Sequence, residues 1–186
     1  MNSPRDSRPG VRHRLFVVST TLVVLAALLF FLCWPLEEID SGRSRSYPQL
    51  FVGAAACPTL GDPGLLGSRA EHSATYRAYR YPYDPTDGVT AVQAYKVASS
   101  CYRSYGSDAD ASRARGEAIE LMTRVSTDYA AARLGLMRAF ESERWDDVIR
   151  EVRHLQLLTS HLGEHEYVEW LRKIEGKAVA MQSTRP

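Results

Sequence analysis

An uncharged stretch of twenty-two residues constrains this chain more than any other feature of its sequence. It begins at Leu15 and ends at Leu36. As a helix rising about 1.5 Å per residue it would be about 33 Å long, enough to cross a hydrocarbon layer of about 30 Å. It also lacks the polar face that a helix on the surface of a globular domain normally presents. The sequence therefore predicts one transmembrane helix over residues 15–36.

The charges on the two sides of this stretch predict its orientation. Four arginines precede it within residues 1–14, and three carboxylates follow it within residues 37–40. Cytoplasmic flanks carry the excess of arginine and lysine, so we expect residues 1–14 to form a basic cytoplasmic tail. Everything after the anchor would then be exported, and any activity would lie in that exported part.

A cleaved signal peptide is the main alternative to an anchor. The apolar core of a signal peptide usually has about 7–15 residues and ends near small side chains. This stretch is longer and ends in the bulky side chains of Phe30, Phe31 and Trp34. We therefore expect a single-pass protein of a bacterial inner membrane with its C-terminal domain in the periplasm. A type II protein of a eukaryotic secretory membrane is the alternative location.

The exported part is expected to be an all-α domain. Residues 37–61 are polar or rich in small residues, Gly and Pro, which is typical of a linker. No later segment alternates with the period of a strand, and apolar residues recur with helical spacing. Short turns separate the predicted helices, and Ser126, Thr127 and Asp128 indicate a break between the third and the fourth. The six predicted helices span residues 62–81, 89–105, 107–125, 129–142, 146–162 and 164–181.

Six such helices would make about three antiparallel hairpins within residues 62–181, followed by a disordered tail at residues 182–186. Each hairpin buries its apolar face by stacking on its neighbour. At residues 129–162 the helix pair resembles a tetratricopeptide repeat in its length of about 34 residues and in several positions. The matching residues are Leu134, Gly135, Phe140, Trp145, Val148 and Ile149.

The resemblance implies a helical repeat whose concave face binds peptides or proteins, with the glycine allowing close approach of the paired helices. Arg138 stands where the family usually has an aromatic residue. We expect a membrane-anchored scaffold or adaptor that binds an envelope protein, as an accessory subunit of a secretion, motility or envelope-assembly complex. From helical geometry, Tyr95, Arg138 and Trp170 are the side chains expected to contact that partner.

A second hypothesis rests on a segment in which tyrosines and arginines alternate, residues 76–83. Tyr76, Arg77, Tyr79 and Arg80 could stack on and bind a cell-wall glycan or a small ligand. The alternative is that the tyrosine rings pack inside the first hairpin while the arginines reach water. Net charge is +1, so no overall field favours nucleic acid, and we expect no nucleic-acid partner.

The chain shows no motif of a known catalytic or cofactor site. A nucleophile elbow, a phosphate-binding loop and a dinucleotide fingerprint are all absent from the sequence, so we expect neither an enzyme nor a cofactor. His161 and His165 have a spacing that suits metal ligands on one helix, but Gly163 would break that helix, so no metal site is expected. Cys57 and Cys101 could form a disulfide in an oxidising compartment, or they could be two buried free thiols.

Overall fold

The computed structural model of this protein describes residues 47–183. The predicted cytoplasmic tail, the anchor over residues 15–36 and residues 184–186 of the predicted disordered tail lie outside the described residues. The first two residues of that predicted tail, Gln182 and Ser183, belong to the last helix, so the tail was predicted to begin too early. Within the described range, none of the helices combines the length and the apolar character needed to cross a membrane. The same range is all-helical, as expected, and contains no strand.

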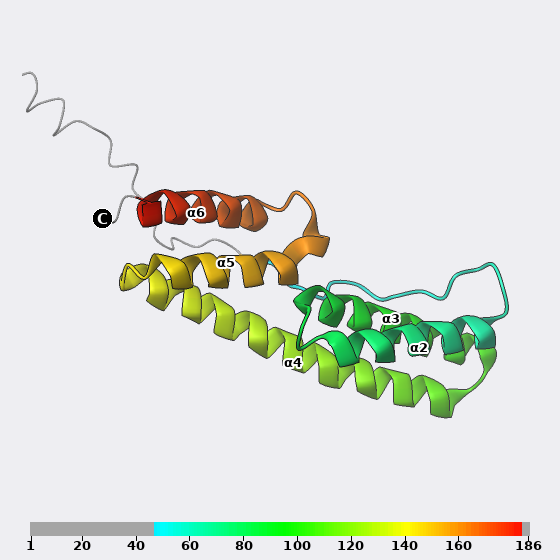
Figure 1. Ribbon diagram of the computed structural model, residues 1–186. Coiled ribbons are helices and arrows are strands. Elements are labelled where there is room, and N and C mark those ends of the chain that lie inside the picture. The colour runs from blue at the N-terminus through cyan, green and yellow to red at the C-terminus, as the bar shows by residue number, and fades with distance from the viewer. Residues whose placement is uncertain (1–46, 184–186) are drawn as a thin grey trace, which may run out of the picture. The chain divides into compact units, whose positions relative to one another are not determined.

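Five α-helices and one short 3₁₀ turn make up the described part (Figure 1). Asp62 and Asp84 each accept a hydrogen bond from a backbone N–H of the helix that follows, and each precedes a proline at the first helical position. Gly106, with φ of 90°, ends the second of these helices in the left-handed conformation. The elements are α2 (Pro63–Arg80), α3 (Pro85–Tyr105), α4 (Asp108–Glu141), α5 (Trp145–Thr159), η1 (Ser160–Leu162) and α6 (Glu166–Ser183).

Helix α3 packs against α2 on one side and against the first half of α4 on the other. Small residues at these contacts allow the backbones to approach closely. A Cβ atom on Gly67 would lie 3.0 Å from the ring of Tyr102, and a Cβ atom on Gly88 would overlap the ring of Tyr81. Close packing of this kind leaves no room for larger side chains at the two glycines.

The second half of α4 packs against α5, and α6 packs on α5 (Figure 1). Aliphatic side chains fill this part of the core, and Val148, Val152, Leu155 and Leu171 are fully buried. Helix α4 therefore takes part in both helix groups: α3, which also packs against α2, lies along its beginning, and α5 packs along its end.

The prediction of six helices is wrong, because residues 107–125 and 129–142 belong to one continuous helix, α4. The polar residues at the expected break are satisfied without one. Thr127 donates its hydroxyl to the carbonyl oxygen of Thr123, and Asp128 accepts a hydrogen bond of 2.5 Å from the hydroxyl of Tyr81. Val125 and Tyr129 are buried on either side, so apolar packing holds the helix straight through this region.

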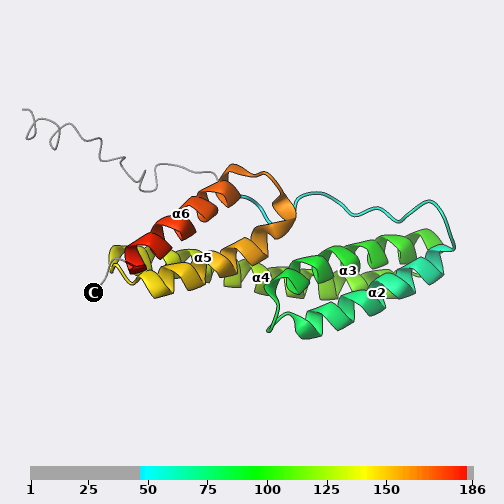
Figure 2. The same cartoon turned by 45° about the horizontal axis from the view of Figure 1, so that its top comes forward.

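The second half of the predicted linker packs against the helices. We call residues 47–61 the strap. The strap passes the α5–α6 connection and runs beside α3 to the start of α2 (Figure 2). Leu50 is buried, and its carbonyl oxygen lies 2.9 Å from Nε2 of His161. The domain thus begins well before Asp62.

Candidate functional site

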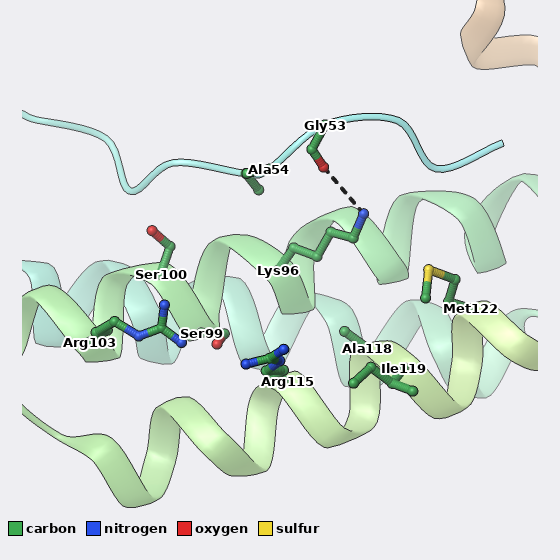
Figure 3. Close-up of a pocket in the computed structure, with 11 residues that line it drawn as sticks. Gly53, Ala54, Lys96, Ser99, Ser100, Arg103, Arg115, Ala118, Ile119 and Met122 are labelled. Carbon is green, nitrogen blue, oxygen red and sulfur yellow. Dashed lines mark hydrogen bonds between the residues drawn. The ribbon is translucent and has the colours of Figure 1, made fainter. Parts of the chain in front are cut away.

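A cavity of about 650 Å³ lies between the strap and the helix pair α3–α4 (Figure 3). We call it the strap groove. Its walls are Gly53, Ala54 and Ala55 of the strap, Lys96, Ser99, Ser100 and Arg103 of α3, and Arg115, Ala118, Ile119 and Met122 of α4. Short side chains on the facing surfaces of the two helices leave this hollow. Ser99, for example, donates its hydroxyl to the carbonyl oxygen of Ala111 and so stays within the helix contact.

Three cationic side chains line the strap groove. Lys96 lies with Nζ 3.5 Å from the carbonyl oxygen of Gly53 and 5.8 Å from the ring centre of Phe51. Arg103 and Arg115 come from the two facing helices (Figure 3), and neither forms an ion pair within residues 47–183. Charged groups that lack a partner in a concave site favour the binding of an oppositely charged group.

Six of the thirteen arginines in residues 47–183 have carboxylate partners, and these two do not. Arg113, two residues before Arg115, binds Glu71 at 2.9 Å and also pairs with Asp110. Burial opposes the ionisation of Glu71, but its bonds to Arg113 and to the hydroxyl of Tyr102 outweigh that effect and lower the pKa of Glu71. Similar pairs hold Arg77, Arg80, Arg144, Arg150 and Arg153.

A second cavity, also of about 650 Å³, lies between the strap and α4. Met122 lines both cavities, so they adjoin along α4. No charged side chain is among the described residues that line this second cavity. It is lined by Pro48, Gln49, Leu50 and Phe51 of the strap and by Met122, Thr123, Ser126, Thr127, Tyr129 and Ala130 of α4.

An aromatic cluster holds the first end of the strap. The guanidinium carbon of Arg133 lies 3.1 Å from the ring centre of Tyr47, and Tyr47 makes an edge contact with Tyr167 at 5.7 Å. Burial raises the pKa of Tyr129 and of Tyr167. Among the described residues, neither of these two hydroxyls nor Nε of Arg133 has a hydrogen-bond partner. An edge contact with Tyr167 and a cation–π contact with Arg133 attach Tyr47 to the helices.

A disulfide holds the other end of the strap. The structure joins Cys57 to Cys101 of α3, with Cα atoms 4.7 Å apart, which is one of the two arrangements that the sequence leaves open. The backbone N–H of Cys57 also donates to the hydroxyl of Ser100 at 3.2 Å. Cys101 is fully buried near the C-terminal end of α3, so the bond fixes this part of the strap to the last turns of that helix.

The structure does not bring together the three side chains predicted to contact a partner. Tyr95 is only 5% exposed, and its hydroxyl lies 3.1 Å from that of Thr75, so its prediction as a surface contact is wrong. The reason is that α2 covers the face of α3 on which it lies. Arg138 is exposed near the end of α4, and Trp170 is half-buried and stacked on Tyr167. Neither lines either cavity.

The tyrosine and arginine segment is arranged differently from both sequence-based alternatives. Arg77 and Arg80 lie 2.8 Å and 3.1 Å from the carboxylate of Asp87, which is buried at the start of α3. Tyr76 and Tyr79 are 60% and 78% exposed. The rings of these two tyrosines are therefore accessible, while the arginines are held by an ion pair.

The candidate histidine ligands have other partners. His161 contacts the carbonyl oxygen of Leu50, and Nδ1 of His165 accepts a hydrogen bond from the backbone N–H of Tyr167. Nowhere in residues 47–183 do three or more His, Cys, Asp or Glu side chains group as metal ligands would.

Two of the residues behind the repeat resemblance, Phe140 and Trp145, contact each other at the α4–α5 turn. Phe140 and Trp145 make an edge contact at 5.7 Å, and Gly135 lies where a Cβ atom would be 3.2 Å from the side chain of Glu151. Yet α4 alone has 34 residues, as many as a whole predicted helix pair. No protein-family model, curated protein or solved structure matches this chain.

Sequence reasoning missed the strap groove. Its cationic residues lie on helices whose exposed faces carry mixed charges, and no sequence signal distinguishes Arg115 from the paired Arg113. The site depends on the strap, and the cysteine pair was the one sequence signal that could have placed the strap against α3.

Proposed function

We propose that this protein is a membrane-anchored helical adaptor that binds a protein partner in the strap groove. The main support for this proposal is that Arg103 and Arg115 line a cavity whose other lining residues include apolar side chains. Neither arginine has an ion-pair partner among the described residues. The anchor over residues 15–36, with its basic cytoplasmic flank, would hold this domain on the exported side of the membrane. An envelope protein is the proposed partner.

The lining of the two cavities supports binding rather than catalysis. The described lining residues include no carboxylate, imidazole or thiol. The hydroxyl of Ser99 is used in a bond to Ala111, and that of Ser100 accepts from Cys57. Catalysis by proton transfer or nucleophilic attack most often uses such groups, and the one amine in the lining, that of Lys96, contacts the carbonyl oxygen of Gly53.

Site-specific photocrosslinking in intact cells tests this proposal. A photoreactive residue replaces Ile119 in the groove, and the matched control replaces Val179 on α6; the two positions are 48% and 46% exposed. We expect a discrete protein adduct from position 119 and none from position 179. Absence of an adduct at 119, or equal yields at both positions, would refute the strap groove as the partner site.

A second candidate function is favoured by the exposure of Tyr76 and Tyr79. Accessible aromatic rings on one side of a helix can stack on the faces of sugars. We propose cell-wall glycan binding at these rings as the alternative. Tyr76→Ala with Tyr79→Ala should then reduce sedimentation of the full-length chain with peptidoglycan, while Tyr105→Ala, which removes a ring that is also exposed, should not. Equal sedimentation of all three proteins would exclude glycan binding by these rings.

A further inference from the structure

The two cavities under the strap form one path along α4. They share Met122, and their lining on this helix runs from Arg115 to Ala130. At 1.5 Å per residue this is about 22 Å, which matches six or seven residues of extended chain at about 3.3 Å each. A compact small ligand would occupy only part of such a path, whereas an extended peptide would fill it.

The strap shows that an extended backbone fits this surface. It is held at Tyr47, at the buried Leu50, which contacts His161, and at Cys57. Between Leu50 and Cys57, Lys96 makes a long contact of 3.5 Å with the carbonyl oxygen of Gly53, and Val52 is exposed. Residues 52–56 are therefore the part of the strap that can shift to admit a second chain with little loss of contact.

The chemistry of the path changes from one end to the other. Lys96, Arg103 and Arg115 surround the first cavity, and no carboxylate is among its described lining residues. The second cavity has hydroxyl and apolar lining: Thr123 and Thr127 donate to backbone carbonyls of their own helix, which leaves their oxygens able to accept hydrogen bonds. A ligand that matches both cavities carries negative charge at one end only.

We infer that the strap groove and the adjoining cavity bind an extended peptide segment of six or seven residues, with carboxylates at one end and small polar or apolar side chains at the other. This inference rests on the proposed function, since it names the part of the partner that enters the groove.

The test uses the full-length chain in phosphatidylcholine nanodiscs and fluorescent seven-residue peptides. Each peptide has three Glu and four other residues, which are two Ser, one Ala and one Leu. One peptide carries the three Glu at its N-terminal end, a second carries them at its C-terminal end, and a third has them dispersed. We expect the better end-charged peptide to bind more tightly than the dispersed one, and its affinity to fall as salt is added. The double change Arg103→Ala and Arg115→Ala should weaken the affinity for this peptide at least about tenfold, which corresponds to about 1.4 kcal/mol of binding free energy.

The matched control removes two exposed cations elsewhere, with Arg172→Ala and Lys177→Ala on α6, and should leave binding unchanged. Equal binding of the three peptides, or equal losses in both double variants, would overturn the inference. So would displacement of the peptide by phosphatidylglycerol vesicles through the same two arginines, because the groove would then serve lipid headgroups. A crosslink at position 119 without peptide binding would refute the proposed acidic peptide ligand but would still agree with the proposed adaptor function.

Discussion

Removing the disulfide should destabilise the domain by about 4–5 kcal/mol. Cys57 and Cys101 are separated by 44 positions, and closing a loop of that size is worth about 4 kcal/mol in the chain-entropy model. Replacing both by alanine also deletes a fully buried sulfur atom at position 101, which costs about 1 kcal/mol. Because small domains have total stabilities of about 5–15 kcal/mol, this change is a large fraction of the whole.

The assay is urea unfolding of the full-length chain in mild detergent, followed by circular dichroism, in a Cys33→Ala background. Thermal unfolding gives a second measurement. The 137 described residues imply an unfolding entropy of about 0.29 kcal/mol per kelvin, so the melting temperature should fall by about 15 °C. Reductant should lower the stability of the protein that keeps both cysteines and leave the double variant unchanged. If the free energy of unfolding fell by less than about 1 kcal/mol, with an unchanged urea slope, the disulfide would not be what holds the strap on the helices.

Three further predictions concern the helix contacts. Gly88→Ala should lower the free energy of unfolding by about 1–3 kcal/mol, because the new methyl group overlaps the ring of Tyr81. Thermal unfolding measures this loss, and an unchanged melting temperature would mean that α3 can move away from Tyr81 at no cost. Tyr81→Phe should lower the free energy of unfolding in urea by about 1–2 kcal/mol, since it removes the hydrogen bond to Asp128 while keeping the ring. A Tyr81→Phe protein as stable as the parent would show that this bond does not stabilise the middle of α4. The pKa of Glu71 is lowered in the folded state, so the stability from its pair with Arg113 is complete above the ordinary glutamate pKa and is lost as pH falls through the lowered one. Thermal unfolding should therefore show the parent more stable than Glu71→Gln at pH 6, with the difference shrinking below about pH 4; a constant difference would contradict the assignment.

The helix ends that the sequence predicts well are those with local causes. Asp62, followed by proline, begins a helix, and Gly106 ends one, because these residues satisfy or stop the backbone hydrogen bonds of a few neighbours. The same pair of residues at Asp84 and Pro85 begins α3 four residues before the predicted start at residue 89, so that start was predicted too late. Such signals need no knowledge of the rest of the chain. They allowed the all-helical class and most of the turns to be predicted.

The errors of prediction come from contacts between residues that are distant in sequence. Asp128 looks like a helix breaker until Tyr81, 47 residues away, is placed beside it. Tyr95 looks like a surface residue until α2 covers it. Arg103 and Arg115 form one site only because α3 and α4 face each other beneath the strap. Periodicity shows which face of a helix is apolar, but not which partner covers it.

If the partner enters the strap groove, a bulky side chain that fills the groove should prevent its binding. A photoreactive residue at Met122 would be introduced into two full-length variants, Ile119→Trp inside the groove and Val179→Trp outside it. Adduct yields in intact cells would be compared at equal protein levels. We expect the adduct to be lost with tryptophan at position 119 and kept with tryptophan at position 179. An adduct of undiminished yield in the Ile119→Trp protein would show that the partner binds elsewhere.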